Sequence, residues 1–260
     1  MSVCLDRQVE DSTKIIPNGD YIRLSLALST GLCSPIGREK PSMTMQVGMI
    51  ASDGLLLASD TRSTRSPNVS GLGVRHGYNS HKIKIDDTGS MAIACARDMV
   101  AANNFADVLF TLRDEKEQNR IRRIKEIGTE VADGHNMECI IGFAYPTPSL
   151  YYFQYIDKAV TVCDQIFTYV FGGDAVNAAI FWIRNYYDFQ PINQLKRLAA
   201  HMIISAGIIS PDFISGLEIV YCDGSGFNRL SVKDNISMEL EAKEWNKKIG
   251  QFILTGTAVS

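Results

Sequence analysis

Residues 43–62 read MTMQVGMIASDGLLLASDTR and are the most informative part of the chain. Residues 44–51 and 55–60 form two apolar runs, and Asp53-Gly54 between them is a dipeptide that favours a tight hairpin turn. A threonine stands directly behind a methionine at the head of the first run. If Thr44 becomes the first residue of the chain, it carries both a hydroxyl and a free α-amine, which can serve as a nucleophile and its base.

The remaining chain alternates between groups of strands and pairs of helices. We expect the strands to follow apolar runs and the helices to follow 3.6-residue periodicity or capping signals. The expected strands are 82–86, 90–95, 138–144, 150–156, 166–171, 216–222 and 227–232. The expected helices are 97–113, 115–132, 174–187, 192–209 and 237–254. Residues 63–80 are rich in Ser, Gly, Asn and Pro and predict a long exposed loop.

This order argues against a doubly wound parallel sheet, in which single strands would alternate with single helices. It favours an α+β fold, in which two antiparallel sheets lie between two helix layers as a four-layer αββα sandwich. The predicted domain covers residues 44–236, and residues 237–260 form a C-terminal tail with helical potential.

Composition excludes several classes of function. The 260 residues are 45% hydrophobic and 21% charged with a formal net charge of -3, so no basic surface predicts a nucleic-acid partner. No apolar run approaches the roughly 20 residues needed to span a bilayer. The six cysteines form no CxxC pair, which favours buried, reduced thiols in a cytoplasmic protein. No cluster of cysteine, histidine and acidic residues has ligand spacing, so we expect no metal and no cofactor.

The first 43 residues predict an extension outside the domain. Acidic residues precede the apolar stretch at residues 23–33 and serines interrupt it, so it is a poor match to a secretory signal. The extension is either a propeptide that is removed or the product of a start codon upstream of Met43. The second interpretation is favoured.

Three patterns in the domain resemble a known family. They are the stretch from Thr44 to Arg62, Lys82 at the head of an Ile-x-Ile strand, and the D-x-x-S-G pattern at residues 212–216 after a long helix. In this order they resemble the proteasome β subunits of the N-terminal nucleophile hydrolase superfamily. The likeness spans residues 44–233 and points to a bacterial proteasome-type peptidase or a divergent relative.

The resemblance implies a role for five side chains. Thr44 would be the nucleophile, and Lys82 would contact it and lower its proton affinity. Asp60 would pair with Lys82 and keep its ammonium charged. Asp212 and Ser215 would support the amine end through hydrogen bonds. Each residue alone has a simpler interpretation, because threonine favours strands, aspartate favours turns and lysine is common on edge strands.

The chain also departs from the family pattern. Self-cleaving members have glycine where Met43 stands, so autocatalytic release of an extension is not expected. Removal of an initiating methionine would expose the same amine. The family has a glycine-rich turn where this chain reads Ala-Cys-Ala-Arg at residues 94–97. The backbone amides of Cys95 and Ala96 are the candidate oxyanion donors there.

A third departure lies at Gly172-Gly173-Asp174, where the family carries a serine near the amine. Gly173 falls at that position and cannot replace a hydroxyl. Asp174 is expected to cap the helix that follows, and its charge is a candidate substitute for the serine.

Together these patterns predict a threonine-type hydrolase that cleaves amide bonds, peptide bonds above all, through an acyl-enzyme on Thr44. Its partners would be a peptide or small amide substrate and further copies of the chain in a ring or stacked assembly. Two alternatives remain open. One is a non-peptidase amidohydrolase of the same fold, and the other is a catalytically inactive structural or assembly subunit.

Overall fold

The hairpin at the head of the domain forms where the sequence predicts it. The computed structural model describes residues 44–64, 77–174 and 177–256; the predicted extension and most of the predicted loop lie outside these ranges. Strands β1 (Met45–Ala51) and β2 (Gly54–Ser59) pair antiparallel. Gly54 has φ +154°, and a Cβ there would lie 1.9 Å from the carbonyl oxygen of Cys222, so the tight turn needs glycine.

Two five-stranded antiparallel sheets form the centre of the domain. The first has the order β10-β1-β2-β11-β12, and the second has the order β5-β6-β7-β8-β9. The other strands of the first sheet are β10 (Tyr169–Gly173), β11 (Glu218–Cys222) and β12 (Phe227–Arg229). The second sheet consists of β5 (Ile83–Ile85), β6 (Met91–Arg97), β7 (Met137–Phe143), β8 (Ser149–Ile156) and β9 (Ala159–Ile166).

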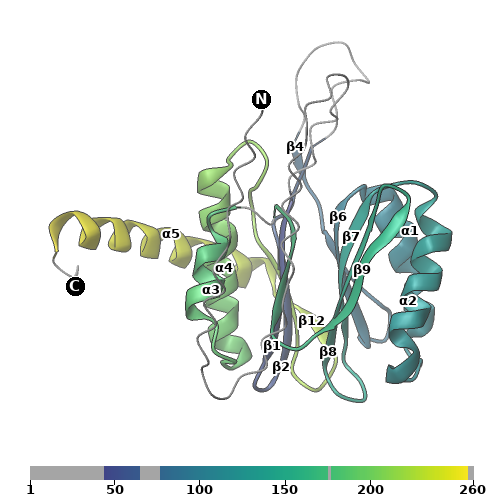
Figure 1. The fold of residues 1–260 in the computed structure, drawn as a ribbon. Helices are drawn as coiled ribbons and strands as arrows, with labels where there is room; N and C mark the ends of the chain where they lie inside the picture. The colour runs from purple at the N-terminus through teal and green to yellow at the C-terminus, as the bar shows by residue number, and fades with distance from the viewer. Residues whose placement is uncertain (1–43, 65–76, 175–176, 257–260) are drawn as a thin grey trace, which may run out of the picture. The chain divides into compact units, whose positions relative to one another are not determined.

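Helices cover the outer face of each sheet (Figure 1). The second sheet carries α1 (Met99–Leu109), the short 3-10 helix η2 (Phe110–Leu112) and α2 (Glu117–Ala132). The first sheet carries α3 (Ile180–Tyr186) and α4 (Ile192–Ile209), and α5 (Val232–Thr255) leaves its edge. The predicted α+β class and the four layers are therefore confirmed.

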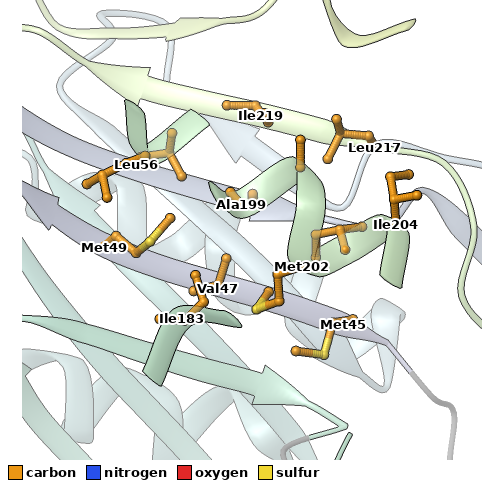
Figure 2. Close-up of a cluster of buried hydrophobic side chains, with 14 of the residues drawn as sticks. Met45, Val47, Met49, Leu56, Ile183, Ala199, Met202, Ile204, Leu217 and Ile219 are labelled. Atoms are coloured by element: carbon orange, nitrogen blue, oxygen red, sulfur yellow. The ribbon is translucent and has the colours of Figure 1, made fainter. Parts of the chain in front are cut away.

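Strand alternation builds three buried cores between the four layers. In β1, Met45, Val47 and Met49 are fully buried and face the helix layer formed by α3 and α4 (Figure 2). In β2, the buried Leu55 and Leu57 face the opposite sheet. Successive side chains on a strand point to opposite faces, so β2 contributes to both cores, and its Leu56 joins the β1 side chains beneath the helices. Each fully buried side chain of this kind contributes about 1.5–3 kcal/mol.

Several element boundaries differ from the prediction. Strand β9 is absent from the predicted set because Cys163 is its one buried residue and it joins the sheet by pairing with β8. The predicted loop begins and ends in a short two-stranded ladder, β3 (Arg62–Thr64) with β4 (Gly77–Asn79). The described cysteines, all in strands, are buried and free: Cys95, Cys139, Cys163 and Cys222.

Two of the predicted helix starts were also wrong. Asp174 does not cap α3, which begins six residues later with Ala179 at its N-cap position. The C-terminal helix begins at Val232 instead of residue 237, because the Ser231 hydroxyl accepts the Asp234 N–H at 3.1 Å and caps it. No helix among the described residues has the length and apolarity that crossing a bilayer requires.

Candidate functional site

Three polar side chains predicted to act together meet between the two sheets. Thr44 precedes β1, Asp60 follows β2, and Lys82 precedes β5 of the second sheet. Lys82 Nζ donates to Thr44 Oγ1 at 3.2 Å and to Asp60 Oδ2 at 2.9 Å. The exposed fractions of Thr44, Asp60 and Lys82 are 1%, 0% and 2%, so all three lie away from bulk water.

Asp60 is held by backbone groups on both sides of its carboxylate. Its Oδ1 accepts the Met45 N–H at 2.9 Å, and its Oδ2 accepts the Arg62 N–H at 3.1 Å. Its own N–H donates to the Met45 carbonyl at 3.0 Å, which ties the end of β2 to the start of β1. The carboxylate therefore has a fixed position from which it orients the Lys82 ammonium.

Burial shifts both members of the Asp60–Lys82 pair towards the neutral form. Loss of hydration raises the pKa of Asp60, and the Lys82 charge and three hydrogen bonds oppose that shift. Loss of hydration also lowers the pKa of Lys82, and Asp60 opposes it. Lys82 therefore gives up a proton more readily than a lysine in water, a property that often accompanies functional sites.

Gly173 lies against the backbone of Thr44. It is opposite Met45 in the β1–β10 register, and the N–H of Asp174 donates to the Thr44 carbonyl at 2.7 Å. Gly173 has φ +82°, and a Cβ there would lie 2.0 Å from the Thr44 carbonyl oxygen. A serine at this position would collide with the threonine, so the glycine is required by the close approach of two backbones.

Ser215 and Asp212 differ in how closely they approach this cluster. The Ser215 carbonyl accepts the Thr61 N–H at 3.0 Å and the Thr61 hydroxyl at 3.4 Å, which places Ser215 next to the end of β2. Asp212 is exposed on the turn after α4. Among the described residues no hydrogen bond joins its carboxylate to Thr44, Asp60 or Lys82. The predicted roles of Asp212 and Ser215 stay predictions.

The two candidate oxyanion amides both have strand partners. The Cys95 N–H donates to the Lys82 carbonyl at 3.0 Å. Amides alternate in direction along an antiparallel strand, so the Ala96 amide points the other way, towards its register partner Glu138 on β7. Each amide would have to give up its ladder bond to bind an oxyanion. Their role also stays a prediction.

Two residues that were not predicted from the sequence fix the start of β5. Glu218, the first residue of β11, accepts the N–H groups of Lys82 and Ile83 at 2.8 and 3.2 Å. Arg229, the last residue of β12, is ion-paired with Glu218 and donates to the Ile83 carbonyl at 2.7 Å. A carboxylate inside the otherwise apolar stretch LEIVYC at residues 217–222 is the signal that could have identified Glu218.

The chain resembles known proteins in its fold but not in its sequence. No protein-family model matches the chain, and no curated protein matches its sequence. Among solved structures, Anbu (ancestral β-subunit) from Yersinia bercovieri is 14% identical with a TM-score of 0.63, covering 83% of this chain and 99% of that one. The helical assembly of the Anbu complex from Pseudomonas aeruginosa is 16% identical with a TM-score of 0.62, covering 83% and 98%. Anbu from Hyphomicrobium sp. strain MC1 is 11% identical with a TM-score of 0.61, covering 83% and 99%.

These matches correct the resemblance drawn from the sequence. The similar structures reported above are those of Anbu proteins, a distinct family, so the assignment to the proteasome β subunits of the N-terminal nucleophile hydrolase superfamily was wrong. The D-x-x-S-G pattern and the residues Thr44, Asp60 and Lys82 occur in a fold that more than one family shares. They therefore indicate the fold and do not identify one family within it. At 11–16% identity the likeness shows the fold: the chain has the architecture of the Anbu ancestral β-subunit.

Proposed function

We propose that the chain is a threonine-type hydrolase that cleaves amide bonds, including peptide bonds, through an acyl-enzyme on Thr44. The strongest support is that Lys82 Nζ lies 3.2 Å from Thr44 Oγ1 and 2.9 Å from Asp60 Oδ2. A hydroxyl is a weak nucleophile until a neighbouring group lowers its proton affinity or accepts its proton. The proposed reaction uses both effects.

In the first half of the proposed reaction, Thr44 Oγ forms a bond to the substrate carbonyl carbon and its proton passes to a base. The resulting tetrahedral intermediate collapses, the C–N bond breaks, and the leaving amine takes up that proton. In the second half, water adds to the ester carbon and the bond from that carbon to Thr44 Oγ breaks. The released carboxylic acid and the restored hydroxyl complete the proton balance.

The proposed base is the α-amine of Thr44 in a chain that begins at this residue. An α-amine titrates near ~7.7–8.0, which suits proton transfer near neutral pH. Lys82, donating to Thr44 Oγ1, would stabilise the alkoxide as it develops, and Asp60 would hold the ammonium in position. Ser215, beside Thr61, and Asp212 are proposed to support the amine end.

The proposal requires Thr44 to have a free amine, so the first experiment compares two chains. One contains residues 1–260, and the other begins at Met43, so that methionine removal exposes Thr44. Intact-mass measurement establishes which residue comes first in each product. Both are then incubated with casein, fluorogenic peptide amides and small acyl-amides. We expect turnover from the chain that begins at Thr44.

A peptide β-lactone provides a second readout that does not depend on finding a good substrate. Ring opening by Thr44 Oγ transfers the acyl group to the protein, and peptide mapping locates the added mass. Folded protein that begins at Thr44, hydrolyses none of these substrates and is not acylated by the lactone would overturn the proposal.

An inactive structural or assembly subunit is the second candidate. The observations that favour it are the 1% exposure of Thr44 and the engagement of the Cys95 and Ala96 amides by the sheet. Turnover of small acyl-amides without cleavage of peptides or casein would instead identify the chain as a non-peptidase amidohydrolase. The same substrate panel therefore separates all three functions.

The proposed partner of the domain is a second copy of the chain, in a bacterial cytoplasm. Helix α5 extends away from α4 (Figure 1) and leaves Phe252, Ile253 and Leu254 54%, 74% and 87% exposed. Three adjacent exposed apolar side chains favour self-association. We expect an oligomer in mass photometry and a smaller species for the Ile253→Glu/Leu254→Glu variant. An unchanged distribution would argue against this surface.

The proposed domain limits are residues 44–236, with residues 1–43 and 237–260 as flanking segments.

A further inference from the structure

Lys82 belongs to the sheet opposite the one that carries Thr44 and Asp60, so its position depends on contacts between the sheets. Its ammonium contacts Asp60, at the end of β2. Its backbone is held from a second place, because Glu218 of the first sheet reaches across to the head of β5. Glu218 lies opposite Ser59 in the β2–β11 register, and Ser59 directly precedes Asp60 in the chain. Both ends of the lysine are therefore held by the same part of the first sheet.

The contact from Glu218 has an unusual geometry. One carboxylate oxygen, Oε2, accepts two successive amides, those of Lys82 at 2.8 Å and Ile83 at 3.2 Å. Successive amides in a regular strand point to opposite sides, so the chain bends at this point to turn both towards one anion. The bend occurs at Lys82, the residue whose side chain reaches Thr44. The carboxylate therefore stabilises a local conformation that a free strand would not keep.

The buried charge of Glu218 is compensated on its other side. The side chain is 2% exposed, and Oε1 lies 2.8 Å from His81 Nδ1 and is ion-paired with Arg229. Arg229 Nη2 also donates to the Ile83 carbonyl at 2.7 Å, so the guanidinium holds the same short segment. Burying an unpaired carboxylate would be costly, and these partners make the arrangement stable.

We propose that Glu218, assisted by Arg229, is a positioning residue that places Lys82 Nζ within hydrogen-bonding distance of Thr44 Oγ1. This inference rests on the proposed hydrolase function for its kinetic consequence and on the geometry alone for its structural consequence. Glu218 does not contact the threonine hydroxyl, so it acts only through the backbone of Lys82. Its loss lets the head of β5 straighten and withdraws the ammonium from the nucleophile.

The test is Glu218→Gln in the chain that begins at Thr44. Glutamine keeps the shape of the side chain but loses the charge that pairs with Arg229 and holds the two amides. A displacement on the order of 1 Å costs on the order of 100-fold in rate, so we expect kcat and the rate of acylation by the lactone to fall by that factor. KM is expected to change by less than about twofold, because Glu218 contributes no substrate contact.

Glu138→Gln is the matched control. Glu138 is also a glutamate with a side chain 2% exposed, and it is also paired with an arginine, Arg97, at 3.0 Å. It holds no part of the Lys82 backbone. We expect this control to lose stability to a similar extent, by thermal unfolding, with kcat unchanged.

Activity-independent evidence comes from the crystal structure of Glu218→Gln. We expect the distance from Lys82 Nζ to Thr44 Oγ1 to exceed the hydrogen-bonding limit of about 3.5 Å. A variant that keeps this distance and its kcat, while Thr44→Ala loses hydrolysis, would overturn the positioning role alone. If the unsubstituted protein is inactive but the variant's lysine withdraws, the proposed function fails and the positioning role stands.

Should Glu218→Gln fail to fold, Arg229→Lys gives the same test in milder form. Lysine keeps the positive charge beside Glu218 but cannot also donate to the Ile83 carbonyl in the forked geometry of arginine. We expect kcat to fall about 3- to 10-fold with KM retained, an intermediate loss of position. An unchanged kcat in a folded Arg229→Lys protein would contradict the proposal.

Discussion

Two buried carboxylates in this domain have similar partners but different surroundings. Asp60 pairs with Lys82 beside a threonine hydroxyl, and Glu138 pairs with Arg97 beside the phenol of Tyr152. The Glu138 cluster lies within one sheet, on the adjacent strands β6, β7 and β8. The Asp60 cluster joins two sheets and contains the residue that heads the domain.

The difference shows what distinguishes a candidate reactive site from a structural ion pair. An arginine stays protonated at every accessible pH, so Arg97 supplies charge and shape only. A lysine can release its proton when buried, and burial lowers the pKa of Lys82. Burial and the Glu138 charge raise the pKa of Tyr152, which keeps that phenol neutral. Buried charge alone therefore does not indicate chemistry.

Removing the proposed nucleophile, Thr44, should have the largest effect on the Asp60–Lys82 cluster. For Thr44→Ala we expect hydrolysis to fall by a factor on the order of 10⁴–10⁶, as for the loss of a nucleophile that acts with its base as a unit. The measurement is kcat/KM on the best peptide amide. Thr44→Ser keeps a hydroxyl and should retain measurable turnover. Equal activity in the alanine and threonine proteins would place the chemistry elsewhere.

Removing the lysine from the Asp60–Lys82 pair should lower both stability and activity. Removing the arginine from the Glu138–Arg97 pair should lower stability alone. Lys82→Met leaves Asp60 buried and unpaired, so we expect a loss of about 3–5 kcal/mol in the free energy of unfolding. Hydrolysis should also fall by about 10²–10⁴-fold. Arg97→Met should cost less stability, because the Arg97 side chain is 32% exposed and Glu138 keeps its bond to Tyr152.

Urea unfolding and initial rates measured on both methionine variants test this contrast. Hydrolysis by Arg97→Met should stay within about twofold of the parent, because the Arg97 side chain pairs with Glu138 and supplies no group to the proposed reaction. A large loss of activity in Arg97→Met, with its fold retained, would show that the two clusters are coupled.

Neutralising the first carboxylate should have a smaller effect than removing the lysine. In Asp60→Asn the side-chain oxygen can still accept the Met45 N–H. The NH₂ group faces the Lys82 ammonium, and because both groups are donors they cannot form a hydrogen bond. We expect hydrolysis to fall by about 10²-fold and the free energy of unfolding to fall by about 1–3 kcal/mol. Chemical denaturation and steady-state kinetics measure the two effects. Full activity in a folded Asp60→Asn protein would remove Asp60 from the proposed mechanism.

The smallest expected effect is a change in the pH dependence. Hydrolysis should rise as the α-amine of Thr44 loses its proton near ~7.7–8.0 and fall again as the Lys82–Asp60 pair loses its proton. Because burial lowers the pKa of Lys82, the falling limb should lie below the ordinary lysine value of about 10.4.

Two variants assign the falling limb. In Lys82→Arg the guanidinium keeps its proton, so this limb should disappear even if the overall rate is low. Tyr152→Phe should leave the profile unchanged, because the pKa of Tyr152 is raised away from this range. Loss of the limb in Tyr152→Phe would mean that the second cluster also controls the reaction.

Much of the architecture could be predicted because its elements have local signals. Apolar alternation identified most of the strands, and Asp53-Gly54 predicted the first hairpin turn. Strand β9 gave no such signal, since its residues do not alternate between buried and exposed and its pairing with β8 defines it. Asp174 looked like a helix cap, but its amide is used by the Thr44 carbonyl, a contact made across the sheet.

The site shows the same division. The resemblance to proteasome β subunits singled out Thr44, Asp60 and Lys82, and their side chains lie in contact. Glu218 and Arg229 were not identified, because their importance depends on their facing the head of β5 from another sheet. Asp212, selected by the same pattern as Ser215, lies exposed on its turn.

The amino-acid sequence was enough to predict the two-sheet architecture, because that follows from local periodicity and turn preferences. The residues that could carry chemistry were suggested by the resemblance to proteasome β subunits. The folded structure was needed to show which amides the sheet already uses, how close the lysine lies to the threonine, and which carboxylate holds the lysine there. These properties depend on burial and on contacts between residues up to 154 positions apart. Such contacts leave no periodic trace along the chain.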